Sequence, residues 1–366
     1  MRRIAIVHDY LIDFGGAERV LLALHKTYPD APIYVSIYRK SRLGKFADKF
    51  RGAKVIQSGF GYLPFADKLI SPFRFLIPAI WGSLDLTAYD LIISSASWAV
   101  TKGFEKKKGA TEICYCHTPP RYLYGYDTSR RFDGVMGKLV SFYRLLVNHF
   151  MLQYDFKQAQ KVDYFVANSE EVKRRIEKFY RRGSTVIYPP VELPKLGAST
   201  SDRNYYLTGG RLTAAKNFDL IIKVFNKLGL PLQIYGSGPL EKYLKSMAKD
   251  NIKFLGKVSD EQMANLYGGA KAFVLAQKDE DFGMTAVEAM SFGTPVIAFK
   301  GGGYLESVID GKTGLFFSEL DSESLSSAVE KFEKAKLKPE DSVRQSKKFS
   351  KERFMKEMVT FIDKHA

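Results

Sequence analysis

The hydrophobic pattern of the chain alternates short apolar runs with helix-length stretches. The pattern begins with an apolar run at residues 3–8, continues through a loop that reaches Gly15 and Gly16, and then shows helical spacing from Ala17 to His25. An apolar run followed by a glycine turn and a helix is typical of a buried parallel strand in an α/β domain. Further strands are predicted in the first half at 33–37, 91–94, 112–116, 164–167 and 185–187.

A proline-containing segment divides the chain into two halves. Pro189 and Pro190 are followed by Pro194 and the polar stretch 197–203, which favours a linker. Strands are then predicted at 205–210, 232–235, 252–255, 272–275 and 295–298. This strand–helix alternation in both halves predicts two doubly wound α/β domains. We expect a first domain at 1–190, a linker at 191–204, a second domain at 205–346 and a final helix at 347–366.

Two long helical segments stand apart from the strand–helix alternation. Residues 137–161 have apolar residues at helical spacing with polar interruptions, which predicts an amphipathic helix and not a membrane span. Residues 347–366 have the same spacing, and their predicted buried face consists of Phe349, Phe354, Met358, Phe361 and Ile362.

The charge of the chain is strongly positive and uneven. The 366 residues include 56 Lys and Arg against 40 Asp and Glu, a net charge of +16. Residues 1–195 hold 31 of the basic and 18 of the acidic residues, a net charge of +13, so the second half carries only +3. A basic half suggests an anionic partner, such as nucleic acid, a membrane surface or a phosphorylated ligand, and the alternative is a lysine-rich solvated surface.

Cysteine content and the N-terminal sequence bear on the compartment of the protein. Two cysteines in the chain exclude a disulfide-stapled secreted scaffold. The first ten residues, MRRIAIVHDY, lack the long apolar run of a signal peptide. We therefore expect a cytoplasmic protein.

The most specific pattern lies at residues 280–290, which read EDFGMTAVEAM. The segment follows a predicted strand and leads into a helix, so the turn at Gly283 presents backbone N–H groups at the positive end of the helix dipole. Glu280 precedes this helix and Glu288 lies within it. Two carboxylates beside an anion-binding turn suit a ligand that has both phosphates and hydroxyls. The alternative is that Glu280 and Asp281 cap the helix while Glu288 is solvated.

A pair of cations follows the first strand of the second half. Arg211 stands in the sequence Gly-Arg-Leu, and Lys216 comes five residues later. Arginine offers a planar bidentate donor and lysine a point charge, and together they suit a diphosphate. No Asp-rich metal motif accompanies them, so we expect no metal; the alternative is that both side chains are simply solvated.

Two glycine turns give weaker signals. Gly15 and Gly16 open the first helix, and Gly236 lies in the turn at 235–239 of the second half. Such turns also serve close packing, and neither is followed by the Gly-Lys-Ser/Thr of a P-loop.

The segment 114–120, CYCHTPP, ends a predicted strand. Cys114 and Cys116 share one face of the strand and have no second ligand pair, which argues against zinc. His117 lies at the carboxyl end of a parallel strand, where ligand sites of α/β sheets form. A packed structural histidine is the alternative.

Residues 59–81 combine six aromatic residues with three prolines and only three charges. The prolines at 64, 72 and 78 exclude a clean spanning helix. We interpret the segment as a surface that enters the membrane interface, assisted by Lys102 and the lysines at 106–108. A buried loop-and-helix packing region is the alternative.

Together these residues resemble the retaining GT-B glycosyltransferases of the "group 1" family over nearly the whole chain. The Glu-x7-Glu element from Glu280 to Glu288 matches the signature of that family. GRLTAAKN at 210–217 is similar to its diphosphate-binding motif, and FLGKVSDEQMANLY at 254–267 to its nucleoside-proximal loop. The first half, with IVHDYLIDFGGAERVL, CYCHTPPRYLY and DYFVANS, resembles the branch of O-antigen and capsule mannosyltransferases.

The resemblance implies an α/β GT-B architecture, with two Rossmann-like domains facing across a cleft and a C-terminal helix that crosses back to the first domain. It implies a nucleotide diphospho-sugar as donor substrate, bound mostly to the second domain, with no cofactor or metal. Arg211 and Lys216 would stabilise the leaving diphosphate. Glu280 would bind sugar hydroxyls and Glu288 the ribose. The remaining donor contacts would come from Gly236, Val258 and the backbone of Phe282, Gly283, Met284 and Thr285.

In the first domain, the resemblance implies that Gly15 and Gly16 let the backbone approach the diphosphate, and that His117 bonds the sugar from the acceptor side. Retaining members are thought to react on one face of the sugar, with the leaving phosphate oxygen accepting the acceptor's proton. No covalent nucleophile is therefore assigned, and Asp9 and Asp13 are the residual candidates.

The predicted function is transfer of a sugar, with mannose from GDP-mannose expected, to a lipid-linked saccharide acceptor in cell-surface polysaccharide or lipopolysaccharide biosynthesis. The protein would be peripheral to the inner face of the cell membrane and contact its anionic surface. Alternatives are a different nucleotide sugar, a nucleotide-sugar epimerase, an inactive sugar-nucleotide-binding module and a nucleic-acid-binding protein. The basic residues are not ordered around any nucleic-acid-binding motif, so we expect no nucleic acid partner.

Overall fold

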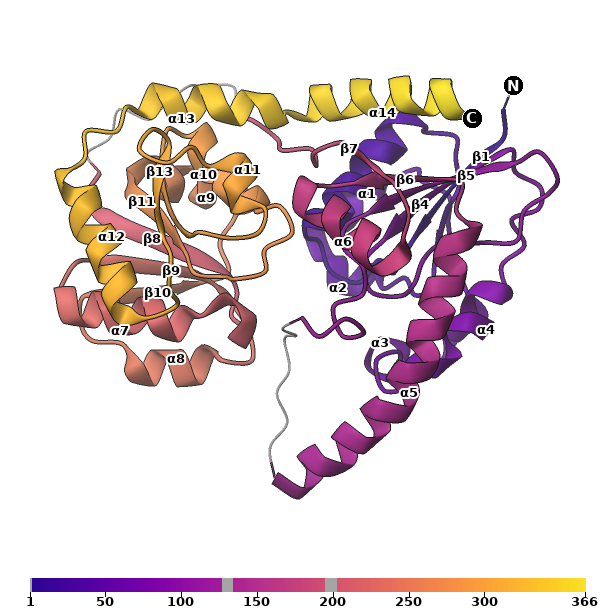
Figure 1. Cartoon of the computed structure of the whole chain (residues 1–366), viewed down its shortest axis with the longest axis horizontal. Helices are drawn as coiled ribbons and strands as arrows, with labels where there is room; N and C mark the ends of the chain where they lie inside the picture. Colours follow the sequence, from indigo (N-terminus) through magenta and orange to yellow (C-terminus); the bar gives the residue numbers. More distant parts are fainter. Residues whose placement is uncertain (1, 127–133, 195–202) are drawn as a thin grey trace. The chain divides into compact units, whose positions relative to one another are not determined.

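The computed structural model describes residues 2–126, 134–194 and 203–366, which belong to two compact units (Figure 1). The first unit contains the described residues up to 190 together with the C-terminal segment 351–366, and the second contains those from 191 to 350. Of the linker predicted at 191–204, residues 195–202 lie outside the described part of the chain. Among the described residues, no helix is both long and apolar enough to cross a bilayer.

The first unit is built on a parallel sheet of seven strands in the order β3-β2-β1-β4-β5-β6-β7. The strands are β1 (Ile4–His8), β2 (Ile33–Val35), β3 (Val55–Gln57), β4 (Leu91–Ala96), β5 (Thr111–Cys116), β6 (Tyr164–Ala167) and β7 (Thr185–Val186). The chain winds outward from β1 to β3 and then returns to β4 on the other side of β1. Ligand sites of open α/β sheets form where the winding reverses in this way, at the carboxyl ends of the strands.

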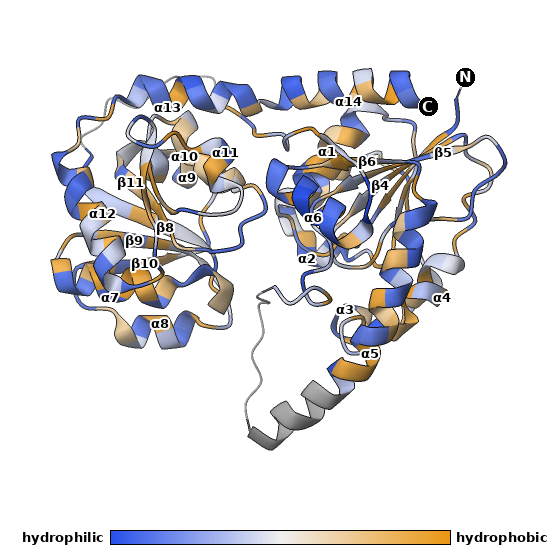
Figure 2. Cartoon of the chain, in the orientation of Figure 1, coloured by the Kyte–Doolittle hydropathy of each residue, from blue (hydrophilic) through white to orange (hydrophobic). Residues whose placement is uncertain are grey.

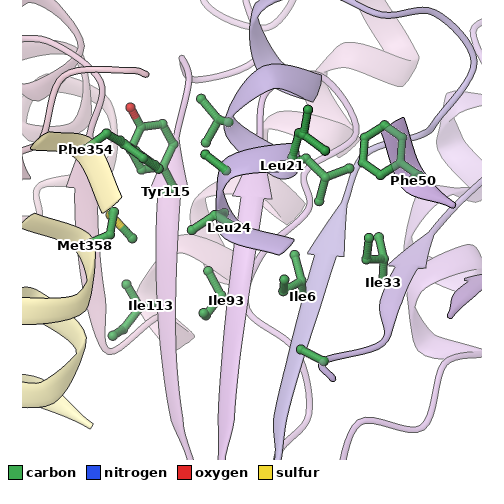
Figure 3. Packing of buried hydrophobic residues seen from close by; sticks show 14 of the residues in the cluster. Ile6, Leu21, Leu24, Ile33, Phe50, Ile93, Ile113, Tyr115, Phe354 and Met358 are labelled. Atoms are coloured by element: carbon green, nitrogen blue, oxygen red, sulfur yellow. The ribbon is translucent and has the colours of Figure 1, made fainter. Parts of the chain in front are cut away.

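The helices of the first unit are of very different lengths. The long ones are α1 (Gly16–Thr27), α5 (Gly134–Lys161), α6 (Glu170–Tyr180) and α14 (Lys351–His365). Short helical turns lie between β2 and β4, namely α2 (Lys40–Leu43), η1 (Gly44–Phe50), η2 (Gly59–Tyr62), α3 (Ala66–Leu69), η3 (Arg74–Leu76) and α4 (Ile77–Gly82). The core between α1 and the sheet consists of buried aliphatic residues such as Ile6, Leu21 and Ile93, and Phe354 and Met358 of α14 extend it (Figure 3).

The second unit repeats the doubly wound plan with six parallel strands in the order β10-β9-β8-β11-β12-β13. These are β8 (Tyr205–Arg211), β9 (Leu232–Ser237), β10 (Ile252–Gly256), β11 (Ala270–Leu275), β12 (Val296–Phe299) and β13 (Gly314–Phe317). Its helical elements are η4 (Ala214–Lys216), α7 (Phe218–Leu228), α8 (Glu241–Met247), α9 (Asp260–Gly269), α10 (Met284–Ser291), α11 (Tyr304–Ser307), α12 (Ser322–Lys334), α13 (Pro339–Ser346) and η5 (Lys347–Phe349). The prediction of two doubly wound α/β domains is confirmed.

The C-terminal segment departs from the single helix predicted at 347–366. Ser350 is extended (φ −66°, ψ 155°) and separates η5 from α14. Phe349 packs against Phe282 of the second unit, with ring centroids 5.2 Å apart, whereas Phe354, Met358 and Ile362 are buried in the core of the first unit. The predicted buried face is therefore divided between the two units, because one extended residue rotates the helix that follows.

Helix α5 departs from the amphipathic pattern predicted for 137–161 along residues 145–151. Met151 and Ala159 are buried as expected. On the opposite face Leu145, Leu146 and Phe150 are 69%, 59% and 49% exposed. Apolar side chains therefore occupy both the inner and the outer face of this helix along residues 145–151.

Candidate active site

Glu280 lies in the loop between β11 and α10, at the carboxyl edge of the second sheet. Its backbone carbonyl accepts a hydrogen bond from the N–H of Gly303 at 2.9 Å. The Tyr304 hydroxyl donates to Oε2 of Glu280 at 3.3 Å, and the ammonium of Lys216 lies 3.7 Å from the same oxygen. The structure therefore brings Glu280 and Lys216 together, as the sequence predicts for a donor site, and adds Tyr304 to them.

Lys216 is placed by the short turn η4, which directly follows β8. The next residue, Asn217, has a left-handed backbone (φ 50°), and its side-chain amide donates to the carbonyl of Ala276 at 2.8 Å. This bond ties η4 to the end of β11, so the side chain of Lys216 is directed toward Glu280. Arg211 is the exposed last residue of β8, on the same edge of the sheet.

Three consecutive glycines, Gly301 to Gly303, fold tightly over Glu280 and Phe282. A Cβ atom at Gly302, where φ is +55°, would lie 2.3 Å from the carbonyl oxygen of Glu280. A Cβ atom at Gly303 would lie 2.2 Å from the Cα of Phe282. Only glycine fits such close backbone approaches. Sequence reasoning missed this loop and Tyr304, although a triple glycine after a strand is a visible signal.

The N-cap residue of α10 is Gly283, with φ 85°, and it has no side chain that could cap the helix. No acidic residue lies in the first turn of α10. The alternative that Glu280 and Asp281 cap this helix stays a prediction. The first N–H groups, which belong to Met284 and Thr285, lie at the positive end of the helix dipole, which favours an anion there.

Phe282 differs from its neighbours in this segment, because its side chain is only 2% exposed and packs against Phe349. Only the backbone of Phe282 is therefore suited to contact a ligand. This agrees with the role that the family resemblance implies for it.

Glu288 lies half-buried in α10. The hydroxyl of Tyr267 donates to its Oε2 at 3.4 Å, and Tyr267 also bonds Tyr235 at 3.1 Å. Val258 is half-buried between β10 and α9, directly before the Ser259 N-cap. Glu288 therefore is not merely solvated, since a tyrosine from the predicted nucleoside-proximal segment contacts it.

Gly236 pairs with Gly210 across β8 and β9. Its φ is +105°, and a Cβ atom there would lie 1.9 Å from the carbonyl oxygen of Gly210. The close approach of the two strands alone requires glycine at this position, so the residue type is no evidence for ligand binding.

In the first unit, Gly15 is the N-cap residue of α1 and Gly16 its first residue. The backbone N–H of Gly15 donates to Oε2 of Glu18 at 2.8 Å, so this N–H group is already satisfied inside the protein. Gly16 is exposed. Of the two glycines predicted to approach a diphosphate, Gly16 thus is the one without this internal bond.

A line of four polar side chains crosses three adjacent strands near their carboxyl ends. His117 follows β5, and its Nε2 lies 2.8 Å from Oγ of Ser95 on β4. The same oxygen lies 3.0 Å from Nδ1 of His8, the last residue of β1. Nε2 of His8 is 3.6 Å from the carboxylate of Glu18 on α1. We call this Glu18–His8–Ser95–His117 line the buried relay, since none of its members is more than 8% exposed.

Asp9 is a structural anchor. It is 2% exposed and accepts hydrogen bonds from the backbone N–H of Trp98 at 2.6 Å, from the hydroxyl of Ser97 at 2.6 Å and from the hydroxyl of Thr101. These donors occupy its oxygens, which argues against a nucleophile at Asp9. Asp13 instead pairs at 3.4 Å with Arg42.

The two cysteines are buried on β5 and pack with Phe165 and Tyr180. Burial raises the pKa of the Cys114 thiol to about 12, so this group is held as a thiol. Across residues 2–126, 134–194 and 203–366, no group of three or more His, Cys, Asp or Glu could hold a metal ion.

We expect Glu18 to stabilise the first unit in a pH-dependent way. Burial raises the pKa of its carboxyl group, but the hydrogen bonds from His8 and the backbone outweigh this effect and lower it below the ordinary value. A lowered carboxyl pKa stabilises the fold above the ordinary glutamate pKa and ceases to do so as the pH falls through the lowered value. Glu18→Gln should therefore lower the free energy of unfolding at pH 7 by about 1 kcal/mol, with a smaller loss in acid.

Urea unfolding at several pH values measures this difference. Glu330→Gln, which changes an exposed glutamate of α12, is the matched control and should have little effect at any pH. A loss in Glu18→Gln that stays constant down to strongly acidic pH would contradict the role of its charge.

Comparisons with solved structures define the class of fold. The chain is similar to the lipopolysaccharide outer core galactosyltransferase WaaB, with a TM-score of 0.69 and 16% identity over 100% of both chains. It is also similar to Anabaena HepE in complex with UDP-glucose, with a TM-score of 0.71 and 19% identity over 100% of both. The fold is therefore that of the GT-B glycosyltransferases.

Family models divide the chain at the same place as the fold. Residues 14–195 match the model of "Glycosyltransferase Family 4", and residues 192–349 match that of "Glycosyl transferases group 1". Each half of the chain thus matches a glycosyltransferase family model, and the two matches together cover residues 14–349.

Curated relatives match only part of the chain. An uncharacterized glycosyltransferase of Methanocaldococcus jannaschii is 29% identical over 57% of this chain and 62% of its own length. The GDP-mannose-dependent alpha-mannosyltransferase of Corynebacterium glutamicum is 32% identical over 33% of this chain and 29% of its own length. The chain thus spans less than two thirds of either relative.

Proposed function

We propose that this chain is a retaining glycosyltransferase that moves a sugar from a nucleotide diphospho-sugar to a saccharide acceptor. The observation that carries the proposal is the cluster of Lys216, Glu280 and Tyr304 in the segment that leads into the N-terminus of α10. A cation, a carboxylate and a helix N-terminus on one sheet edge match the three parts of such a donor, namely its diphosphate, its sugar hydroxyls and its distal phosphate.

In the proposed reaction the bond between the anomeric carbon and the phosphate oxygen breaks while the acceptor oxygen bonds to the same carbon. The acceptor hydroxyl gives its proton to the departing phosphate oxygen on the same face, so the configuration is retained without a protein nucleophile. Lys216, with Arg211, would stabilise the negative charge that develops on the diphosphate. Glu280, oriented by Tyr304, would accept hydrogen bonds from the sugar hydroxyls.

We propose GDP-mannose as donor and a lipid-linked saccharide as acceptor. Support for mannose comes from the resemblance of the first half to mannosyltransferases and from the GDP-mannose-dependent relative of Corynebacterium glutamicum. A UDP-hexose is the competing donor, because the structurally similar HepE was solved in complex with UDP-glucose. An acceptor anchored by a lipid in cell-surface polysaccharide biosynthesis would place the enzyme at the inner face of the cell membrane.

A panel of nucleotide sugars tests the proposed function. Purified protein is incubated with GDP-mannose, UDP-glucose, UDP-galactose and UDP-N-acetylglucosamine, and release of the nucleoside diphosphate is followed by mass spectrometry. We expect GDP-mannose to be consumed and the anomeric signal of the product in NMR to show retention. If calorimetry detects binding of none of these donors, the proposed function is wrong.

A further inference from the structure

Exposed apolar side chains are concentrated in two short stretches of the first unit. Within the described part of the chain, fourteen large apolar side chains are exposed, and eight of them fall within residues 62–75 and 145–150. We call these eight the apolar face: Tyr62, Leu63, Phe65, Phe73, Phe75, Leu145, Leu146 and Phe150. Single exposed apolar residues are ordinary, but a gathered set of this size marks an interaction surface.

Side chains join the later part of the first stretch, residues 72–75, to α5. The guanidinium of Arg74 donates twice to Oδ1 of Asn148 on α5, at 2.8 and 3.2 Å. The hydroxyl of Tyr143 donates to the carbonyl of Pro72, and Arg74 also lies over the Tyr143 ring. In Figure 2, apolar residues colour α5 where it runs beside α3 and α4.

Arginines hold the backbone under the apolar face in place. Arg39 donates to the carbonyls of Gly61 at 2.7 Å and Leu63 at 3.2 Å, and Arg42 pairs with Asp67 at 2.5 Å. These bonds fix the backbone of residues 61–67, and the side chain of Phe65 is 67% exposed there.

The charge around the apolar face is positive. Asp67 is the sole acidic residue between 59 and 84, and Arg42 neutralises it; residues 134–154 contain no acidic residue at all. Lys68 extends beside Phe65, with its ammonium 5.4 Å from the ring centroid, and Arg144 adjoins Leu145.

Most of the lysines that we expected to assist a membrane contact are occupied elsewhere. Lys102 is buried and paired with Asp155. Lys106 pairs with Asp163, and Lys107 with Asp90. For Lys102, Lys106 and Lys107 that expectation from the sequence is wrong, because Asp155, Asp163 and Asp90 pair with them. Lys108 is exposed, and its part in a membrane contact stays a prediction.

The exposed face of α5 changes character within two turns. Leu145, Leu146 and Phe150 point outward in its described first part, whereas Gln153, Lys157 and Gln160 are the exposed residues further on. A helix whose apolar exposure ends at a polar boundary suits partial immersion in a membrane interface.

We propose that the apolar face enters the headgroup and acyl boundary of an anionic bilayer, with Lys68 contacting lipid phosphates. Aromatic side chains flanked by basic residues are favoured at this depth. A second copy of this chain fits less well, because two such surfaces would bring like charges together. The purpose of the contact, to reach a lipid-linked acceptor, rests on the proposed function, but the contact itself needs neither donor nor acceptor.

Brominated-lipid quenching tests the proposal directly. Phe65→Trp places a reporter in the apolar face, and Tyr243→Trp places a matched one on α8 of the second unit, where Tyr243 is 52% exposed. With vesicles of brominated phosphatidylcholine and phosphatidylglycerol, we expect the tryptophan fluorescence of Phe65→Trp to be quenched more strongly than that of the unmodified chain. The fluorescence of Tyr243→Trp should show no quenching beyond that of the unmodified chain. Equal quenching at the two positions would overturn the proposal.

Vesicle sedimentation gives the second measurement. Phe65→Ser combined with Phe150→Ser should lower partitioning into phosphatidylglycerol-containing vesicles about tenfold, while the control Tyr243→Ser should bind like the unmodified chain. Binding should also weaken as salt is raised. Unchanged partitioning of the double variant would refute a lipid partner. A lipid partner would also be refuted if the unmodified chain did not bind vesicles and instead formed an oligomer that the double variant does not form.

The outcome is independent of the proposed activity. The double variant should transfer sugar to a water-soluble acceptor as the unmodified chain does, because no altered residue belongs to the candidate active site. If the chain binds vesicles but transfers no sugar, the proposed membrane contact is supported and the proposed function is wrong.

The buried relay carries a second, independent inference about His117. The Glu18 carboxylate lies 3.6 Å from Nε2 of His8, and its negative charge favours the His8 tautomer that is protonated on Nε2. Nδ1 of His8 is then an acceptor, and the Ser95 hydroxyl donates to it. The lone pairs of Ser95 then accept from Nε2–H of His117. We infer that His8 is a positioning residue that, through Ser95, fixes His117 in the tautomer protonated on Nε2.

Nitrogen-15 NMR of histidine-labelled protein tests the inference without any substrate. The chain has five histidines, so their ring signals can be assigned from single variants. At pH 8 we expect His117 as the Nε2–H tautomer, and a mixture of tautomers in Ser95→Ala and in His8→Gln. His149→Gln, on the exposed face of α5, is the matched control and should change nothing. A wild-type His117 protonated on Nδ1, or one unaffected in Ser95→Ala, would overturn the inference.

Discussion

Replacing Glu280 by glutamine should lower kcat at least about a hundredfold, which is the usual effect of removing a group that stabilises the transition state. The carboxylate lies 3.7 Å from the ammonium of Lys216 and accepts a hydrogen bond from Tyr304, so both groups orient it for contact with sugar hydroxyls. A carboxamide of the same size loses the charge and sets an NH₂ donor beside the ammonium. Steady-state kinetics with saturating donor measures the effect.

The matched control is Glu241→Gln, which removes a carboxylate paired with Lys245 on α8. Its kcat should equal that of the unmodified enzyme. If Glu280→Gln retains normal turnover while the donor still binds, Glu280 has no part in the reaction, and the assignment of the cluster must be withdrawn.

Replacing Lys216 by alanine should weaken binding of the donor diphosphate about ten- to a hundredfold, because a charge-assisted contact to phosphate is lost. The side chain of Lys216 is 25% exposed, and Asn217 positions it through the bond to Ala276. Its loss also leaves Glu280 without its cation, so we expect kcat to fall together with affinity. Calorimetric titration with the nucleoside diphosphate separates the two effects, since it measures binding alone.

Lys223→Ala is the control for this variant, since Lys223 is 57% exposed on the neighbouring helix α7 and pairs with Asp219. It should leave both binding and turnover unchanged. An unchanged dissociation constant in Lys216→Ala would exclude this lysine from the diphosphate site, even if turnover fell.

Most of the strands could be anticipated from the chain, and the exceptions have a common cause. The strands missed by sequence reasoning, β3 and β13, are three and four residues long and only partly buried. Edge strands of this kind lack the continuous apolar run by which a central parallel strand is recognised. The break at Ser350 was missed for a related reason, because both sides of it have helical spacing and no glycine or proline marks it.

The candidate site was predictable where its residues follow one another in the sequence. Glu280, Gly283 and Glu288 lie in one segment, and its passage from strand to helix already predicts an anion-binding turn. Tyr304 and the triple glycine were not recognised, because their relation to Glu280 depends on two loops of different strands meeting at the sheet edge. Contacts between residues that lie far apart in the sequence are not visible in its local pattern.

The sequence by itself determined the two doubly wound domains, the position of the Glu-x7-Glu segment and the excess of positive charge, because each follows from local periodicity or composition. Only the tertiary structure decided which charges are available. Lys102, Lys106 and Lys107 are neutralised by aspartates far along the chain, whereas Lys216 meets Glu280 and Lys68 lies beside exposed Phe65. The physical reason is that electrostatic and apolar contacts depend on distance in space, which the fold sets and a linear pattern does not contain.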